Sequence, residues 1–266
     1  MSIFGFIGTG NMGTALASAA VREVPGDNIY LSNRTQDKAK ELAGKLGAVF
    51  TENDVIASKA DFIILGVKPQ GLQALFDEIA PILQSRKSNF VLVTMAAGTE
   101  IAQIQQMAGI NVPVIRIMPN ISVNVGKGVI LFSASEGVAA NRMQEFIDGM
   151  SGAGTFYELP ESQIDAASAI SGCGPAFIAM FMEAMADGAV ACGLPRELSY
   201  KLVSETLLGT SSLQIETDLC PSAFKDIVCS PAGTTIEGVR TLEEYGFRGA
   251  VMDAVIAAFE KNESFK

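Results

Sequence analysis

The chain has 266 residues and a net charge of −10, from 29 acidic and 19 basic side chains. This length exceeds the roughly 100–150 residues usual for one domain and predicts two domains. The negative charge disfavours nucleic acid and anionic membranes as partners, because an acidic surface repels both. Small anionic substrates are not excluded, because helix ends and single arginines bind anions locally.

Metal and disulfide chemistry lack support in the sequence. The chain has no histidine, and its four cysteines show no C-x-x-C spacing: Cys173, Cys192, Cys220 and Cys229. We therefore expect no metal site and no disulfide framework, and we interpret the four side chains as buried or semi-buried thiols.

Two apolar regions bear on the compartment. The chain begins with a predicted strand and lacks the basic segment, apolar core and cleavage site of a secretory signal. The apolar stretch from Ala166 to Leu194 contains Glu183, Asp187 and Pro175, which favour a core or subunit-interface helix over a membrane span. The sequence thus predicts a cytoplasmic protein with no membrane partner.

A glycine-rich turn near the start is the strongest functional signal. Residues 8–13 read G-T-G-N-M-G, directly after an apolar strand and before a small-residue helix. In this fingerprint Gly8 permits the tight turn, Gly10 lets the backbone approach a pyrophosphate, and Gly13 allows the helix to pack on the strand. A second strand at 28–31 completes a β-α-β unit. The pattern predicts a dinucleotide whose pyrophosphate lies at the helix N-terminus.

The end of the second strand indicates which dinucleotide binds. A carboxylate there would bond the ribose 2′-hydroxyl of NAD, whereas this chain has Ser32-Asn33-Arg34-Thr35, and Asp27 comes too early. Arg34 keeps its charge and can pair with a 2′-phosphate through two bonds, which favours NADPH, with NADH as a weaker alternative. The other interpretation is a solvated turn with an ordinary surface arginine.

Apolar runs separated by helix-like segments indicate a mostly parallel, doubly wound α/β sheet. After the first two strands, these runs occur at 62–67, 90–95, 112–117, 129–132 and 155–159. Past Pro160 the strand pattern stops, and apolar residues then fall at helical spacing. We predict a dinucleotide-binding domain at 1–160 and a helical domain for substrate binding and dimerisation at 161–266.

Dimerisation is expected from the helical domain. Met180, Phe181, Met182 and Met185 wrap around one predicted helix, so one neighbouring face cannot cover them all. We therefore predict a homodimer through these helices.

Three turns after predicted strands are candidates for the chemistry, because ligands of such sheets bind at the carboxyl ends of the strands. They are Gly66-Val67-Lys68-Pro69, Met95-Ala96-Ala97-Gly98 and Met118-Pro119-Asn120. Lys68 would project into the crevice, although it also fits a surface lysine before a helix that starts with Pro69.

Two segments of the helical domain are unlike ordinary helix. Ser171 to Pro175 interrupts a helix with glycines and proline, and Ser230 to Thr235 begins another. Backbone N–H groups of Ala232, Gly233 and Thr234 at a helix start would form an anion site suited to a substrate carboxylate. The alternative is a simple helix start with a proline and a threonine cap.

The lack of histidine affects the expected reaction type. Reducing a ketone creates an alkoxide that needs a proton donor, and histidine is the usual acid in hydroxy-acid dehydrogenases. Reducing a protonated imine yields a neutral amine and asks less of the enzyme. The sequence therefore favours imine reduction, with lysine or tyrosine still able to serve carbonyl reduction.

Together these segments resemble the pyrroline-5-carboxylate reductase family. The resemblance covers essentially the whole chain, through G-F-I-G-T-G-N-M-G, N-R, V-K-P, M-P-N, S-G-C-G-P-A and S-P-A-G-T-T-I in that order. It implies an NADPH-preferring Rossmann-type domain, a helical dimerisation domain and a substrate pocket between them that the partner subunit completes. A higher ring such as a decamer is left open.

The resemblance also implies roles for single residues. The cofactor-binding residues would be Gly8, Thr9, Gly10, Asn11, Met12, Asn33, Arg34, Asn53, Gly66, Val67, Lys68, Pro69, Ala96 and Ala97. The substrate-binding residues would be Ser230, Pro231, Ala232, Gly233, Thr234, Thr235 and Asp218. Thr235 would be catalytic, through a hydrogen bond to the ring nitrogen.

Two positions depart from the family pattern. Cys173 stands where a serine is more usual, which replaces a good hydroxyl donor with a weak thiol. Asp218 lies where some members carry glutamate near the substrate ring.

The expected function is NADPH-dependent reduction of 1-pyrroline-5-carboxylate to L-proline. Two alternatives remain at this stage. One is another NADP-dependent imine or β-hydroxy-acid oxidoreductase, although residues 171–185 lack the lysine that the hydroxy-acid class would place there. The other is a non-catalytic NADP-binding regulator.

Overall fold

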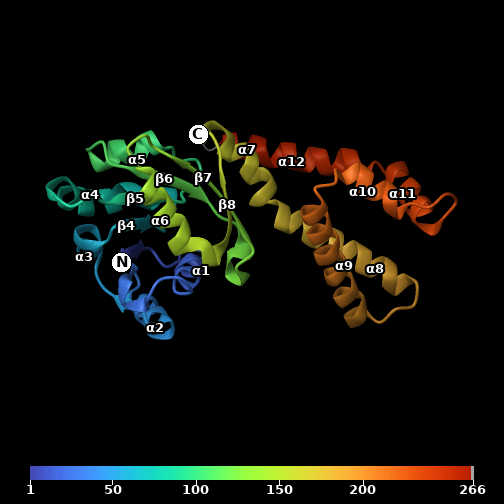
Figure 1. Cartoon of the computed structure of the whole chain (residues 1–266), viewed down its shortest axis with the longest axis horizontal. Helices are drawn as coiled ribbons and strands as arrows, with labels where there is room; N and C mark the ends of the chain where they lie inside the picture. The colour runs from blue at the N-terminus through green and yellow to red at the C-terminus, as the bar shows by residue number, and fades with distance from the viewer. Residues whose placement is uncertain (265–266) are drawn as a thin grey trace. The chain divides into compact units, whose positions relative to one another are not determined.

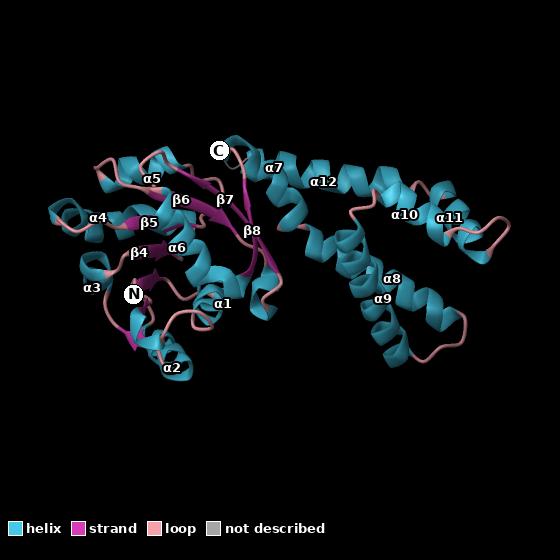
Figure 2. Cartoon of the chain, in the orientation of Figure 1, coloured by secondary structure: helices cyan, strands magenta, loops and turns pink. Residues whose placement is uncertain are grey.

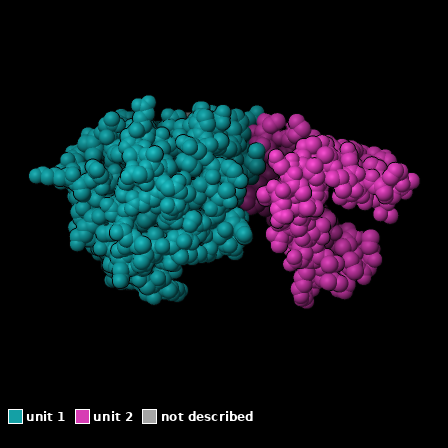
Figure 3. Space-filling view, in the orientation of Figure 1, with its two compact units in different colours: residues 1–172, 259–266 teal, residues 173–258 magenta. Residues whose placement is uncertain are grey.

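The computed structural model describes residues 1–264, which form two compact units. Unit 1 comprises Met1–Gly172 with the chain from Phe259 onward, and unit 2 comprises Cys173–Ala258 (Figure 3). The predicted boundary near residue 160 rests on the end of the strand pattern, and the last strand ends at Glu158. The contacts divide the chain later, because the helix that follows packs on the sheet of unit 1.

Unit 1 is built on one eight-stranded sheet with the order β3-β2-β1-β4-β5-β6-β7-β8 (Figures 1 and 2). Every neighbouring pair is parallel except β6 and β7, which are antiparallel. The strands are β1 (Phe4–Ile7), β2 (Ile29–Ser32), β3 (Val49–Phe50), β4 (Phe62–Leu65), β5 (Val91–Thr94), β6 (Val114–Met118), β7 (Gly128–Ala134) and β8 (Gly154–Glu158). The predicted doubly wound fold is confirmed, and the short strand β3 is the one that the sequence pattern missed.

Helices cover both faces of this sheet. They are α1 (Asn11–Ala20), α2 (Gln36–Leu46), α3 (Asn53–Lys59), α4 (Pro69–Ser85), α5 (Ile101–Ala108), α6 (Ala140–Met150) and α7 (Glu161–Ser171), with 3₁₀ turns η1 (Gly26–Asn28), η2 (Ile121–Val125) and η3 (Ser151–Ala153). One apolar core contains Phe4, Phe62 and Phe146, whose rings lie 4.8–6.4 Å apart. The other core packs Ile63 and Leu92 against α4 and α5. Burial on both faces explains why these strands read as continuous apolar runs.

Unit 2 is helical and has little core of its own. Its helices are α8 (Gly174–Ala191), α9 (Arg196–Thr217), α10 (Pro221–Val228), α11 (Thr234–Glu244) and α12 (Phe247–Glu263), the last of which runs on into unit 1. Within Cys173–Ala258, the buried side chains are Ala186, Ser199 and Val203. The predicted all-helical second part of the chain is confirmed.

The structure bears on the predicted burial of the four cysteines and on the long apolar stretch that follows β8. Cys173, Cys192 and Cys220 are exposed and Cys229 is half-buried, so the interpretation of the thiols as buried was wrong for three of the four. The reason is that the faces of these helices lie open in the single chain. Residues Glu161–Ala191 are long and apolar enough to cross a membrane by length and composition, a weak signal that helices of soluble proteins also give.

Candidate functional site

The turn after β1 has the geometry of a dinucleotide cradle. Gly8 has a φ of +100°, which favours glycine, and a Cβ at Gly13 would overlap the carbonyl oxygen of Gly8. A Cβ at Gly10 would meet no protein atom within 4 Å. The fold itself therefore requires glycine at residues 8 and 13, whereas the absence of a side chain at residue 10 leaves space open above the helix N-terminus.

The start of α1 is suited to an anion. Its N-cap Gly10 offers no side-chain cap, and its first turn contains no acidic residue, so the first N–H groups lack an acceptor within the helix. Thr9 is only 7% exposed, and its Oγ1 has no hydrogen-bond partner within residues 1–264. The free donors, the open space and this buried hydroxyl all fit a bound pyrophosphate.

The end of β2 presents the residues predicted to select the cofactor. Arg34 is exposed, and its guanidinium has no ion pair or hydrogen bond in the described part of the chain. The Asn33 amide donates to the carbonyl of Thr35 at 3.3 Å. Ser32 donates to Oδ1 of Asn53 at 2.6 Å, so Asn53 lies beside this strand end. Arg34 is thus available for a ligand phosphate.

Asn53 has a second contact that the sequence did not predict. Its Nδ2 donates to a carboxylate oxygen of Glu78 on α4 at 3.0 Å. Both ends of its amide are therefore engaged within the protein, and this network ties α3 and α4 to the end of β2.

The turns after β4 and β5 lie at the same edge of the sheet. The N–H of Gly66 donates to Ile7 at 2.8 Å, and a Cβ at Gly66 would overlap the carbonyl oxygen of Gly8. The direct contact between the turns after β1 and β4 therefore explains why residue 66 is a glycine. Lys68 is the exposed N-cap of α4, which has Pro69 in its first turn. After β5, Ala96 is buried and Ala97 is exposed.

The end of β6 contains buried polar groups that sequence reasoning did not connect. Arg116, only 1% exposed, places NH2 2.7 Å from Oδ1 of Asp165 and NH1 3.4 Å from Oε1 of Glu161, both on α7. Asn120 donates from Nδ2 to the Ser171 carbonyl at 2.9 Å and accepts from the Val129 N–H at 3.2 Å. The sequence does show an arginine within an apolar strand, which suggests a buried charge. The pattern does not indicate which carboxylates pair with it.

In unit 2, the segment Ser230 to Thr235 forms a tight turn into α11. Ala232 has a φ of +57°, a conformation uncommon for residues other than glycine, and the Gly233 N–H donates to the Ser230 carbonyl at 3.1 Å. A Cβ at Gly233 would overlap the Ser230 hydroxyl oxygen, an overlap that a rotation of that side chain would relieve. The Gly233 N–H is thus occupied, and the donors without a helical acceptor begin at Thr234.

The N-terminus of α11 is open to a ligand. No side chain caps it, and both Thr234 and Thr235 are exposed. Glu237 lies in the first turn, but its carboxylate pairs with Arg240 at 3.0 Å. Asp218, the C-cap of α9, has a φ of 52° and is exposed. These features of unit 2 fit an anion at the start of α11.

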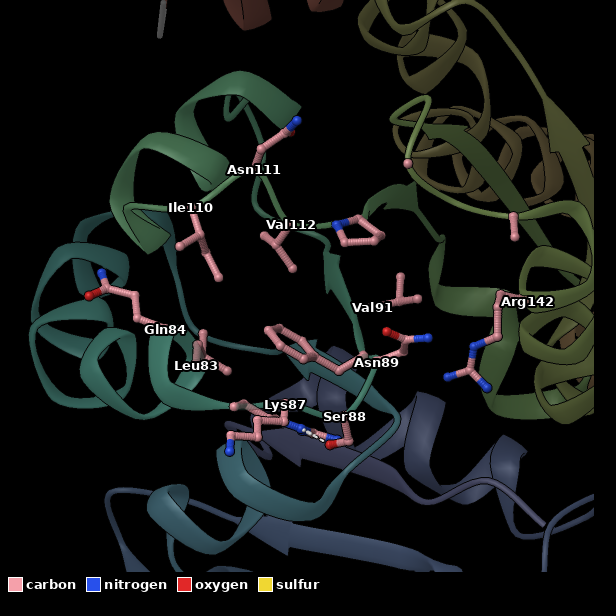
Figure 4. Close-up of a pocket in the computed structure, with 15 residues that line it drawn as sticks. Leu83, Gln84, Lys87, Ser88, Asn89, Val91, Ile110, Asn111, Val112 and Arg142 are labelled. Carbon is pink, nitrogen blue, oxygen red and sulfur yellow. Dashed lines mark hydrogen bonds between the residues drawn. The ribbon is translucent and has the colours of Figure 1, made fainter.

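Cavities occur at both edges of the sheet. A cavity of about 370 Å³ is lined by Arg86, Phe90, Pro113 and Arg142, among others, at the amino ends of β5 and β6 (Figure 4). The turns predicted to bind the dinucleotide follow the carboxyl ends of the strands, so this cavity lies at the opposite edge of the sheet. A second cavity of about 500 Å³ is lined by Pro69, Gly98 and Thr99 and borders the predicted cofactor turns.

No metal centre emerges from the geometry. Within residues 1–264, no group of three or more cysteine, aspartate or glutamate side chains is arranged to hold a metal ion.

Family models match both parts of the chain. Residues 161–265 match the model described as pyrroline-5-carboxylate reductase dimerisation. Residues 3–98 match the model described as NADP oxidoreductase, coenzyme F420-dependent, which spans the β-α-β unit and the turns after β4 and β5.

Whole-chain comparisons agree with these matches. The sequence is 37% identical over 262 residues to a pyrroline-5-carboxylate reductase of Methanosarcina acetivorans, covering 97% of this chain and 96% of the relative. The structure resembles the Plasmodium falciparum pyrroline carboxylate reductase with NADP bound, at a TM-score of 0.86 and 30% identity over 99% of this chain and 97% of that one. It also resembles the pyrroline-5-carboxylate reductase of Coxiella burnetii, at a TM-score of 0.91 and 28% identity over 99% and 98% of the two chains.

Proposed function

The chain belongs to the pyrroline-5-carboxylate reductase family, and from this premise we propose which of its residues perform the reaction. The protein is an oxidoreductase acting on a CH–NH group, and it reduces 1-pyrroline-5-carboxylate to L-proline with NADPH. When bound, NADPH supplies the hydride that the imine carbon accepts. The chain's own residues must bind both molecules, orient them and stabilise the ring nitrogen.

Residues at the carboxyl edge of the sheet hold the cofactor. Residues 8–12 receive the pyrophosphate on the free N–H groups of α1, and the uncapped helix start and the open space above Gly10 support this assignment. Asn33 and Arg34 take the 2′-phosphate, which explains why an exposed guanidinium without a protein partner lies there. The remaining contacts come from Asn53, Gly66, Val67, Lys68, Pro69, Ala96 and Ala97.

The start of α11 holds the substrate carboxylate. The first N–H groups of the helix and the hydroxyls of Thr234 and Thr235 supply donors, and no side chain of the protein occupies this end. Ser230, Pro231, Ala232 and Gly233 shape the turn. Asp218, exposed at the end of α9, is assigned to the substrate ring by the family resemblance alone. The uncapped N-terminus of α11 is the observation that carries this assignment, because an eleven-residue helix with free donors favours an anion.

Thr235 assists the chemical step through its hydroxyl. The protonated imine gains two electrons as hydride at carbon, and the C=N π electrons become the nitrogen lone pair of a neutral secondary amine. A hydroxyl beside the nitrogen, or a water that it orients, stabilises this change without a strong acid. The chain lacks histidine, and imine reduction does not require it.

Replacing Thr235 tests this role directly. Thr235→Val keeps the shape of the side chain but removes the hydroxyl, and we expect kcat/KM for 1-pyrroline-5-carboxylate to fall by ~10- to 1000-fold. Thr235→Ser keeps the hydroxyl and should retain most activity. Thr241→Val is the matched control, because the Thr241 hydroxyl donates within the same helix to the Glu237 carbonyl at 3.0 Å. Wild-type kcat/KM in Thr235→Val would remove the hydroxyl from the mechanism.

The helical part of the chain mediates oligomerisation, as its match to a dimerisation family indicates. We propose a homodimer that buries exposed apolar side chains of unit 2 such as Met180, Leu208 and Met252, which are 63–70% exposed in the single chain. We also propose that the protein is located in the cytoplasm. A larger ring such as a decamer, with the dimers as its units, is included in the proposal as a second assembly state. Sedimentation at micromolar concentrations distinguishes the forms, and a monomer throughout would contradict both.

A further inference from the structure

Strand β6 and the loop after it hold α7 at two separate places. Arg116 on β6 pairs with Asp165 and Glu161 in the first half of α7. Four residues later, Asn120 bonds the carbonyl of Ser171, the last residue of the helix. The first contact is a buried ion pair, and the second is a hydrogen bond from a side chain that is 7% exposed.

The Asn120 amide has one defined orientation. Nδ2 donates to the Ser171 carbonyl at 2.9 Å, while Oδ1 accepts from the Val129 N–H at 3.2 Å. Rotating the amide by 180° would face oxygen to oxygen and N–H to N–H, so both bonds specify the same rotamer. Asn120 therefore joins the loop after β6, the start of β7 and the end of α7.

The end of α7 is a point where the chain changes from one unit to the other. Ser171 and Gly172 close unit 1, and Cys173 opens unit 2. The Ser171 hydroxyl has no partner within residues 1–264, so this residue is held through its carbonyl. Gly172 and Cys173 keep right-handed helical backbone angles, and α8 begins at Gly174. The Asn120 bond is thus the last side-chain bond from the loops of the sheet before the chain enters the unit that carries the α11 site.

We propose that Asn120 is a positioning residue for hydride transfer, acting through the Ser171 carbonyl to fix the last turn of α7 and, with it, the start of the segment that leads to the substrate-binding unit. The inference rests on the proposed function, because it assumes that unit 1 binds the cofactor and α11 the substrate. Hydride transfer demands near-contact geometry, and an error of about 1 Å can cost about 100-fold in rate. Both ends of the Asn120 amide are engaged within the protein, so its proposed effect passes through Ser171 and Val129.

The Asn120→Asp variant tests the bond to Ser171 apart from the bond to Val129. The variant keeps the acceptor for Val129 but loses the donor to Ser171 at high pH, where the carboxylate faces a carbonyl oxygen. Burial and that oxygen raise the carboxyl pKa, and once protonated its O–H can donate again. We expect kcat relative to wild type to be ~10- to 100-fold lower at about pH 8 and to recover at about pH 5.5, with KM changing less than kcat.

Two further readouts do not depend on turnover. Hydrogen exchange in the peptide covering residues 166–175 should be faster in the variant at about pH 8 than in wild type. The Kd for NADPH, from its fluorescence, should stay within about 2-fold of wild type. Asn124→Asp is the matched control, because the Asn124 amide donates to the Ile121 carbonyl at 2.9 Å within its own exposed turn. The control should leave kcat and exchange unchanged.

The outcomes are distinct. Faster exchange with wild-type kcat would overturn the proposal, as would a kcat loss that does not recover at low pH. If Asn120→Asp does not fold, Asn120→Ser removes both bonds without adding charge, and wild-type kcat in that variant would equally overturn it. Failure of the wild-type enzyme to reduce 1-pyrroline-5-carboxylate would instead count against the proposed function, while the exchange experiment would still report on the Asn120 bond.

Discussion

The two units of this protein bury their apolar side chains to very different extents. Unit 1 packs two cores against a sheet, and Phe6, Phe62 and Leu92 have no exposed surface. Unit 2 leaves large apolar side chains open along all its long helices, among them Met180 at 70% and Ile215 at 76% exposure. The difference shows that unit 1 has a core of its own, and it supports the proposal that unit 2 buries its exposed faces against a second chain.

Of the predicted substitutions, charged residues on the exposed helix faces of unit 2 should have the largest effect, on both dimerisation and activity. The double variant Met180→Glu with Leu208→Glu places carboxylates on faces that the dimer is proposed to cover, so we expect loss of the dimer and at least ~100-fold loss of kcat/KM. Unit 1 should still bind 2′,5′-ADP, measured by calorimetry. The control Val125→Glu alters an equally exposed side chain of unit 1, at 72%, and should change neither property.

Removing Arg116 tests the stability of unit 1. Arg116→Met leaves the buried carboxylate of Asp165 without its guanidinium partner, and we expect a loss of about 3–5 kcal/mol in the free energy of unfolding. Chemical denaturation of the dimer at fixed protein concentration measures it. A change below about 1 kcal/mol would show that Asp165 does not depend on this partner.

Two glycine substitutions distinguish fold from ligand binding in the same turn. Gly10→Ala puts its methyl group into open space, so the melting temperature should hold while the Kd for NADPH rises ~10- to 100-fold. Gly13→Ala would overlap the Gly8 carbonyl, so the fold itself should lose stability. Equal effects of the two variants on melting temperature would contradict this division of roles.

Replacing Arg34 should have the smallest of these effects, a change in the Kd for NADPH but not in the Kd for NADH. Arg34→Ala removes the proposed partner of the 2′-phosphate, and we expect the Kd for NADPH to rise about 10-fold while that for NADH stays nearly constant. Fluorescence titration with both cofactors gives the ratio. Parallel weakening of both would assign Arg34 to a part of the cofactor that they share.

The sequence predicted the elements that have strong local signals. The glycine fingerprint located β1, α1 and β2, and the change to helical spacing after Pro160 located the second half. Strand β3 has two residues, too few for any period to be recognised, and was missed. Local patterns were therefore sufficient wherever an element spans several turns or alternations.

The long-range part of the site was not predictable in the same way. Arg116 and Asp165 are 49 residues apart, and a buried ion pair depends on packing that no spacing reveals. The left-handed conformation of Ala232 was likewise unforeseen, because alanine rarely adopts it and only the turn around it imposes it. The helix start at α11 was predicted, but the occupied Gly233 N–H appears only in three dimensions.

The contact between the turns after β1 and β4 limits which amino-acid substitutions these turns can accept. Gly8, Gly13 and Gly66 lie so close together that none of them accepts even a methyl group. The residues after β2, by contrast, are exposed at Arg34 and Thr35, so we expect their replacement to leave the core intact. A change of nicotinamide cofactor would therefore have to keep the three glycines, and residues 33–35 are the positions that we would vary first.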